Sequence, residues 1–107
     1  MNKSCGLSEQ DIAVVVAVLS NYPQVEQGLI FGSRAKGNYR NGSDVDIALK
    51  GSELNFDLLA QISFVLNEES VLPYKFDILN FHTIVNTDLI EHINRVGIIF
   101  YTSGALK

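Results

Sequence analysis

Apolar residues recur along the chain with two periods, one of about 3.6 residues that is typical of amphipathic helices and one of about two that is typical of strands. The longer period predicts helices from just after Ser8 to 21–23, from about 54 to 68 and from about 87 to 96, with one short helical turn over 33–36. The shorter period predicts strands over 25–31, 44–49, 74–79 and 98–101. Because helices and strands alternate throughout, we expect an α/β or α+β domain in which helices cover a sheet.

Cap and turn residues support these boundaries. Ser8 and Asp11 have the spacing of a capping box at the start of the first helix. Gly97 follows the last helix, where a glycine commonly ends one. The apolar segment 98–101 could be a terminal strand or a surface that docks a partner, and we expect the strand. Four aromatic residues are expected in the core: Phe56, Phe64, Phe76 and Phe81.

Three aspartates interrupt the apolar strand patterns. Asp44 and Asp46 lie two positions apart, so a strand would direct both carboxylates to one side, about 6–7 Å apart along the chain. Asp77 lies in the middle of the next strand pattern, and the three acids converge if these two strands are neighbours. Such acids could form a solvent-facing acidic surface, or they could bind a hard divalent cation such as Mg²⁺, which prefers carboxylate oxygens.

The segment before these acids favours the cation. Gly32 and Ser33 follow a strand and open a helical turn, where backbone N–H groups can approach a phosphate. Arg34, Lys36 and Arg40 place three of the eight basic residues close by. The pattern is neither a Walker loop nor a Rossmann fingerprint. Together with the acids, it predicts a nucleoside triphosphate bound with two metal ions that activate a hydroxyl and hold the leaving pyrophosphate.

Length and composition narrow the class of protein. The length of 107 residues predicts a single domain over 1–107. The net charge of −4 argues against nucleic-acid binding over the whole surface. The one cysteine, Cys5, excludes a disulfide framework and a cysteine-built zinc site, and we expect its role to be structural or incidental. No apolar run approaches the roughly 18 residues of a membrane span. We therefore expect a small soluble cytoplasmic protein that makes no membrane contact.

The motif that joins these residues resembles a known pattern. Gly32-Ser33, ten residues, and Asp44-Val45-Asp46 match the Gly-Ser-x10-Asp-x-Asp signature of the DNA polymerase beta-like nucleotidyltransferase superfamily. The run GSRAKGNYRNGSDVDIAL is similar to the minimal nucleotidyltransferase (MNT) domains of prokaryotes. The resemblance implies a nucleotidyltransferase-like fold, with a mixed β-sheet of about four strands flanked by helices.

The resemblance also implies a role for each matching position. Asp44 and Asp46 would ligate two Mg²⁺ ions, and Asp77 would complete the metal site and help deprotonate the acceptor hydroxyl. Gly32 and Ser33 would bind the triphosphate of ATP. Two neighbouring basic residues would also contact the nucleotide: Arg34 and Lys36.

Members of the family transfer a nucleoside monophosphate, usually AMP from ATP, to a hydroxyl. Only about ten residues follow the last helix, so we expect the acceptor on a separate partner and no direct grip on nucleic acid. The resemblance implies a HEPN-domain toxin as that partner, in a hetero-oligomeric complex in which the MNT protein is the antitoxin and AMP goes to a tyrosine. The apolar C-terminal segment is also compatible with a homodimer.

Two other functions remain open at this point. The chain could neutralise its partner by contact alone while keeping a nucleotide pocket, or it could act on a small-molecule or tRNA hydroxyl held by a separate subunit. The intact acids argue against the first of these. The two histidines lack the spacing of metal ligands, so we expect His92 on the surface of the last helix and leave a base contact open for His82.

Overall fold

The computed structural model describes residues 5–104, in which four strands form one mixed sheet with the order β3-β2-β1-β4. The strands are β1 (Gln27–Phe31), β2 (Val45–Lys50), β3 (Phe76–Asn80) and β4 (Ile98–Thr102). β1 is antiparallel to both β2 and β4, whereas β2 and β3 are parallel. The prediction of a mixed four-stranded sheet with a C-terminal strand is thus confirmed.

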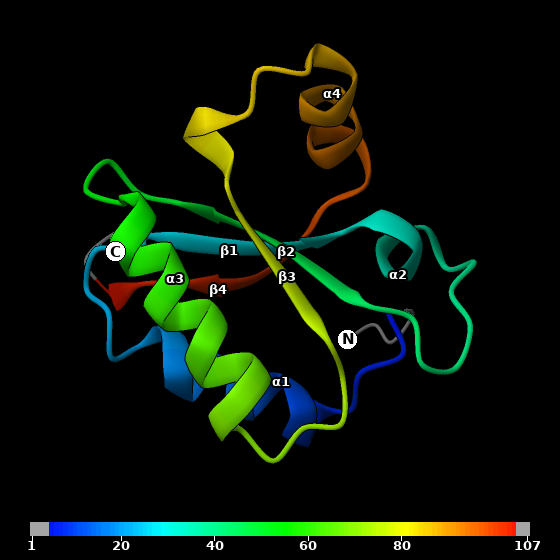
Figure 1. Cartoon of the computed structure of the whole chain (residues 1–107). Coiled ribbons are helices and arrows are strands. Elements are labelled where there is room, and N and C mark those ends of the chain that lie inside the picture. The colour runs from blue at the N-terminus through cyan, green and yellow to red at the C-terminus, as the bar shows by residue number, and fades with distance from the viewer. Residues whose placement is uncertain (1–4, 105–107) are drawn as a thin grey trace.

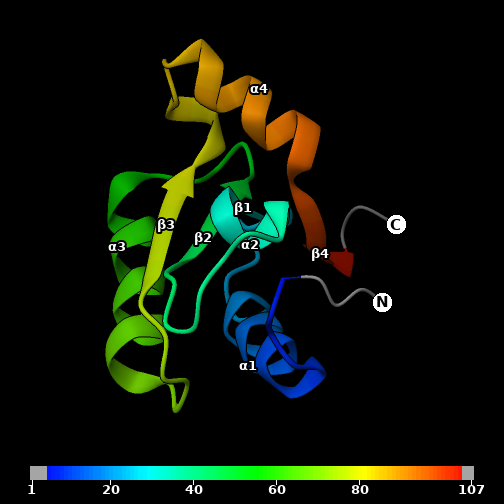
Figure 2. The same ribbon diagram turned by 90° about the vertical axis from the view of Figure 1, so that its right-hand side faces the viewer.

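Helices cover the two faces of this sheet unequally. On one face lie α1 (Glu9–Leu19) and α3 (Phe56–Phe64), which continues as the π-helical turn η1 (Val65–Glu69). On the other lie α4 (Thr87–Val96) and the 3₁₀ turn η2 (Phe81–Thr83), and the short α2 (Gly32–Lys36) follows β1 (Figure 1). Viewed from the side, α4 lies above the sheet and α1 below it (Figure 2). None of the helices within residues 5–104 is long and apolar enough to cross a membrane.

Strand alternation divides the buried side chains into two clusters. Val45, Ile47 and Leu49 of β2 pack into the larger cluster, with residues of α1 and α3. Ala48, between them in sequence, packs with Ile93 of α4 in the smaller cluster. α4 covers only part of the sheet face that carries the smaller cluster. The rest of that face is open for polar side chains.

The cap predictions are confirmed at both helix ends. Ser8 and Asp11 exchange both hydrogen bonds of a capping box, at 3.0 and 3.1 Å. Gly97 caps α4, but its φ of −59° is not left-handed. A glycine fits there because a Cβ would collide with the carbonyl oxygen of Ile93 and lie 3.2 Å from Leu29.

The expectation of burial is wrong for two of the four phenylalanines expected in the core. Phe76 is buried, but Phe56 and Phe64 of α3 are 85% and 55% exposed. Cys5 has a structural place in the fold, since it is buried in the larger cluster and its carbonyl oxygen accepts a hydrogen bond from Arg34.

Candidate functional site

The first part of the site is the turn between β1 and α2. Gly32 makes this turn with φ +74°, in the left-handed region that favours glycine. A Cβ at Gly32 would also collide with a carboxylate oxygen of Asp46. A glycine is therefore needed at position 32 for two reasons: the backbone conformation and the close approach of the Asp46 carboxylate.

The second part of the site is a group of acids on the open side of the smaller cluster. Asp46 of β2 is directly opposite Asp77 of β3 in the parallel pairing, and opposite Phe31 of β1. Neighbouring strands lie about 4.8 Å apart, so the Asp46 and Asp77 side chains are side by side on one face. Asp44 precedes β2 and is exposed. The condition under which the acids would converge, that the second and third strands are neighbours, is met by β2 and β3.

The acids affect one another electrostatically. Partial burial raises the pKa of Asp46 above its ordinary value, and the negative charges of Asp77 and then Asp44 raise it further. Burial disfavours any charge, and like charges nearby disfavour a second one. The ionised carboxylate of Asp46 is thus held in an unfavourable setting.

This arrangement fits a divalent cation although no complete ligand set is preformed. Among residues 5–104, no three His, Cys, Asp or Glu side chains are grouped closely enough to hold a metal by themselves. Mg²⁺ typically uses only one or two protein carboxylates and completes its shell with waters and substrate phosphates. A cation between Asp46 and Asp77 would also relieve the repulsion that raises the pKa of Asp46.

The expected nucleotide-binding residues are placed differently from one another. Ser33 lies in the first turn of α2, directly after the Gly32 turn, and is half-buried. Lys36 ends the helix and is exposed. The amide of Gly32 is already used, because it donates a hydrogen bond to Nε2 of His92 at 3.0 Å. Ser33 is the next residue, and it has both an N–H in the first turn of α2 and a hydroxyl that can bind a phosphate.

Arg34 is buried and committed to the fold. It is only 2% exposed, and its guanidinium donates hydrogen bonds to the carbonyl oxygens of Ser43 and Cys5 at 2.9–3.2 Å. The rings of Tyr39 and Tyr74 lie 5.1 and 5.0 Å from it. This geometry argues against the phosphate contact expected for Arg34 and favours a structural role, in which Arg34 ties the loop before β2 to the N-terminal segment.

The structure adds two residues that the pattern of the sequence did not reveal. His92, expected on the surface, is half-buried and bonds the Gly32 turn across 60 positions. Asn67 of η1 bonds both backbone groups of Phe76, the residue before Asp77, at 2.7 and 3.0 Å. A π-helical turn inside a helix often accompanies a functional site, but single-sequence periodicity does not reveal one. The other histidine, His82, accepts a hydrogen bond from Gly51.

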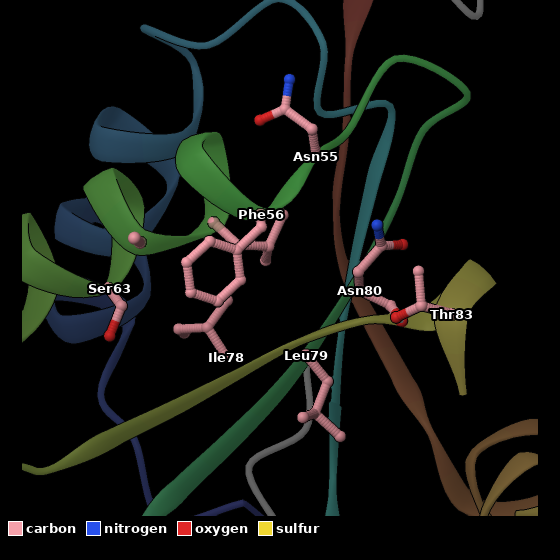
Figure 3. A pocket seen from close by; sticks show the side chains of 9 residues that line it. Asn55, Phe56, Ser63, Ile78, Leu79, Asn80 and Thr83 are labelled. Carbon is pink, nitrogen blue, oxygen red and sulfur yellow. The ribbon is translucent and has the colours of Figure 1, made fainter. Parts of the chain in front are cut away.

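A separate hollow of about 460 Å³ lies between α3 and the edge strand β3. Figure 3 shows Phe56 of α3 beside Ile78 of β3, with Asn80 at the end of β3 and Thr83 in the following turn η2. Ile78 packs with the larger cluster and Leu79 with the smaller one, so this hollow lies along the β3 edge of the sheet. All seven residues expected in the site lie outside it.

One family model matches most of the chain. The family model "Polymerase beta, Nucleotidyltransferase" matches residues 13–104. No curated protein matches the sequence significantly.

Several solved structures share the fold. A chain of a toxin–antitoxin crystal structure with AMP-PNP has a TM-score of 0.72 at 21% identity, with 89% of this chain and 76% of that chain covered. A chain of the toxin–antitoxin MntA–HepT has a TM-score of 0.68 at 18% identity, with coverages of 92% and 75%. A chain from the complex of tri-AMPylated Shewanella oneidensis HEPN toxin with MNT antitoxin has a TM-score of 0.65 at 18% identity, with coverages of 88% and 71%.

At these identities the structural likeness shows a shared fold. The family model is more specific, because it spans most of the chain and includes the Gly32 turn and the acids on β2 and β3. The chain belongs to the polymerase beta nucleotidyltransferase family.

Proposed function

We propose that this protein transfers AMP from ATP, with Mg²⁺, to a tyrosine hydroxyl of a HEPN-type partner and thereby acts as an antitoxin. The observation that carries the proposal is the pairing of Asp46 with Asp77 on an open sheet face, directly beside the Gly32 turn. This arrangement offers carboxylates for cations next to backbone that can approach a phosphate.

The chemistry is a substitution at the α-phosphorus of ATP. The acceptor oxygen forms a bond to that phosphorus, and the bond from the phosphorus to the oxygen bridging to the β-phosphate breaks. Pyrophosphate leaves with the bonding electron pair, and the proton of the acceptor hydroxyl passes to the carboxylate of Asp77. Holding the two reactants in line accounts for much of the acceleration in such reactions.

Each residue of the site has a task in this scheme. Ser33 would bind a phosphate oxygen of ATP through its N–H and hydroxyl, and Lys36 would approach the triphosphate from the exposed end of α2. Asp44 and Asp46 would ligate two Mg²⁺ ions, and Asp77 would complete the metal site. When bound, the metal would act as a Lewis acid on the phosphate oxygens and favour ionisation of the acceptor hydroxyl.

Support for the nucleotide and the partner comes from the proteins of similar fold. One of these structures is of a toxin–antitoxin with AMP-PNP, and another contains a tri-AMPylated HEPN toxin with an MNT antitoxin. AMP on the toxin is the product expected of adenylyl transfer from ATP. We extend that reaction to this chain because two of its acids, Asp46 and Asp77, lie beside each other and next to the Gly32 turn.

The test uses ATP labelled at the α-phosphate. The purified protein is incubated with Mg²⁺, labelled ATP and the proteins that co-purify with it from its native host. We expect label on a tyrosine of a co-purifying protein, located by mass spectrometry. The Asp44→Asn/Asp46→Asn variant is expected to transfer no label, whereas Glu68→Gln/Glu69→Gln, which removes two exposed charges from η1, is expected to behave as wild type.

A different result would identify one of the other functions. If a partner co-purifies with wild type and with the Asp44→Asn/Asp46→Asn variant, and neither labels it, the protein neutralises its partner by contact and the catalytic proposal is wrong. If the label appears on tRNA or on a small molecule, the chain is a catalytic subunit for that acceptor.

A further inference from the structure

We propose that His92 of α4 is a positioning residue that holds the Gly32 turn in the geometry needed for nucleotidyl transfer. The inference rests on the proposed function, which needs Ser33 and Asp46 in defined relative positions. It adds His92, on a helix far away in sequence, as the residue that sets these positions.

The contact between His92 and the turn is specific. The N–H of Gly32 donates to Nε2 of His92 over 3.0 Å in a partly buried position. Nε2 must be unprotonated to accept, so the proton of the neutral ring is on Nδ1. The ring also meets the ring of Phe31 edge to face, with centroids 6.1 Å apart and planes at 79°. Two contacts thus fix the imidazole against both residues of one peptide bond.

The helix that carries His92 is itself firmly attached to the sheet. Its neighbour Ile93 is fully buried in the smaller cluster with Leu29, Phe31 and Ala48. The imidazole is therefore presented to the turn from a rigid support. Sites held on packed helices are placed more accurately than sites held by loops alone.

The position of the turn decides where two functional groups lie. The hydrogen bond that the Gly32 N–H donates to His92 fixes the peptide plane between Phe31 and Gly32. The Cα of Gly32 is already so near the carboxylate of Asp46 that a Cβ would not fit, and Ser33 follows immediately. A rotation of this peptide would move Ser33 relative to Asp46, and so would move the triphosphate relative to the acids.

Two substitutions separate positioning from simple packing. His92→Phe keeps a ring for the contact with Phe31 but removes the acceptor. His92→Gln loses the ring but supplies an amide oxygen close to the position of Nε2. We expect His92→Phe to lower kcat for AMP transfer about tenfold or more with a much smaller change in KM for ATP, because misplaced reactants lose rate. His92→Gln should retain most of the activity.

The chain offers a matched control in its other histidine. Nε2 of His82 accepts from the N–H of Gly51 at 3.1 Å, and its ring meets Phe81 edge to face at 5.9 Å. His82→Phe removes a similar bond from a position away from the acids, so it is expected to leave kcat for transfer unchanged. If His92→Phe transfers AMP as fast as wild type, or if His92→Gln is as impaired as His92→Phe, positioning by the acceptor is wrong.

A second measurement is independent of activity. In ¹⁵N-labelled protein, the N–H···N bond gives a scalar coupling between the Gly32 amide nitrogen and His92 Nε2 that NMR detects directly. We expect the coupling in wild type, and displaced amide resonances at Ser33 and Asp46 in His92→Phe but not in His82→Phe. Unchanged resonances at both positions in His92→Phe would overturn the inference.

This measurement also distinguishes the two proposals. If wild type transfers no AMP, the proposed function is wrong, and the NMR comparison alone decides whether His92 sets the position of Ser33 against Asp46.

Discussion

Asp46 has an ionised form that the fold disfavours and that ligand binding would favour. Its carboxylate is partly buried, lies beside Asp77 in the register and touches the Cα side of the Gly32 turn. An acid with a raised pKa, placed with another acid on an open face, is a common feature of functional sites. Stability of the unliganded protein and readiness to bind a cation therefore oppose each other at this residue.

The first prediction concerns the stability of Asp46→Asn without ligand. The raised pKa of Asp46 means that ionisation costs folding stability. The cost is absent below the unfolded pKa of about 3.9, grows as the pH rises through the folded pKa, and is complete above it. We expect Asp46→Asn to raise the thermal midpoint at pH 7 in EDTA, with the difference from wild type disappearing near pH 3.

Glu53→Gln is the control for this experiment, because it removes one exposed negative charge from a loop. Circular dichroism melts of the three proteins between pH 3 and 8 give the comparison. An Asp46→Asn variant that is less stable than wild type at pH 7 would contradict the argument.

The second prediction separates the two requirements for glycine at the turn. Gly32→Ala and Gly37→Ala both place a side chain at positive φ, at +74° and +86°, but the space beyond Gly37 is empty whereas that beyond Gly32 holds the Asp46 carboxylate. The backbone penalty alone is about 1 kcal/mol. We expect both variants to lose that much in urea unfolding, and Gly32→Ala to lose more and to lose ATP binding by calorimetry. Equal effects of the two substitutions would show that the contact with Asp46 is unimportant.

At the scale of elements, the site depends on how the edge strand β3 is held. In a parallel pair, alternate residues direct their backbone groups away from the partner strand. The side chain of Asn67 fills that position at Phe76, where it accepts from the N–H and donates to the carbonyl oxygen. The π-helical turn η1 places Asn67 there. Its amide side chain makes the two backbone hydrogen bonds that a further strand would otherwise make next to Asp77.

The third prediction follows for Asn67→Ala. The variant leaves both backbone groups of Phe76 without these bonds, which should cost about 1–3 kcal/mol in the free energy of unfolding. Transfer activity should fall as well, because Asp77 is the next residue of the strand. Urea denaturation and the labelled-ATP assay measure the two effects. Asn94→Ala, at an exposed position of α4, is the control, and the role of Asn67 is wrong if the two variants are equally stable.

At the scale of the whole molecule, incomplete coverage of the sheet creates the site. α1 and α3 cover one face, whereas α4 leaves the β2–β3 acids and α2 accessible on the other (Figures 1 and 2). The ligand would bind only to the folded state and not to the unfolded chain. Gly32 is 14 positions from Asp46 and 45 from Asp77 in sequence, so these residues meet only on folding.

The fourth prediction is therefore that Mg²⁺ with ATP stabilises the protein. At a ligand concentration 100 times Kd, the gain is about 2.7 kcal/mol, which calorimetry or thermal melts detect. EDTA should remove the gain. The Asp44→Asn/Asp46→Asn variant should show none, although we expect it to be more stable than wild type without ligand. An equal gain from ATP with and without EDTA would contradict a metal role for these acids.

Local sequence predicted much of the fold and of the site because the relevant forces act within a few residues. Periodicity located the helices and strands, and the capping box of Ser8 and Asp11 marked the start of α1. Gly32, Ser33, Asp44 and Asp46 lie close together in sequence, so one motif could contain them. Asp77 joins this group because its strand, β3, is the neighbour of β2 in the sheet.

Tertiary structure alone decided the roles that depend on distant partners. Arg34 is chemically suited to phosphate, but two backbone carbonyls and two tyrosine rings use its guanidinium in the fold. His92 meets Gly32 across 60 positions, and Asn67 reaches Phe76 because a π-helical turn directs it there. The sequence thus determined which side chains could perform the chemistry, whereas packing determined which of them are free to do so and which hold the others in place.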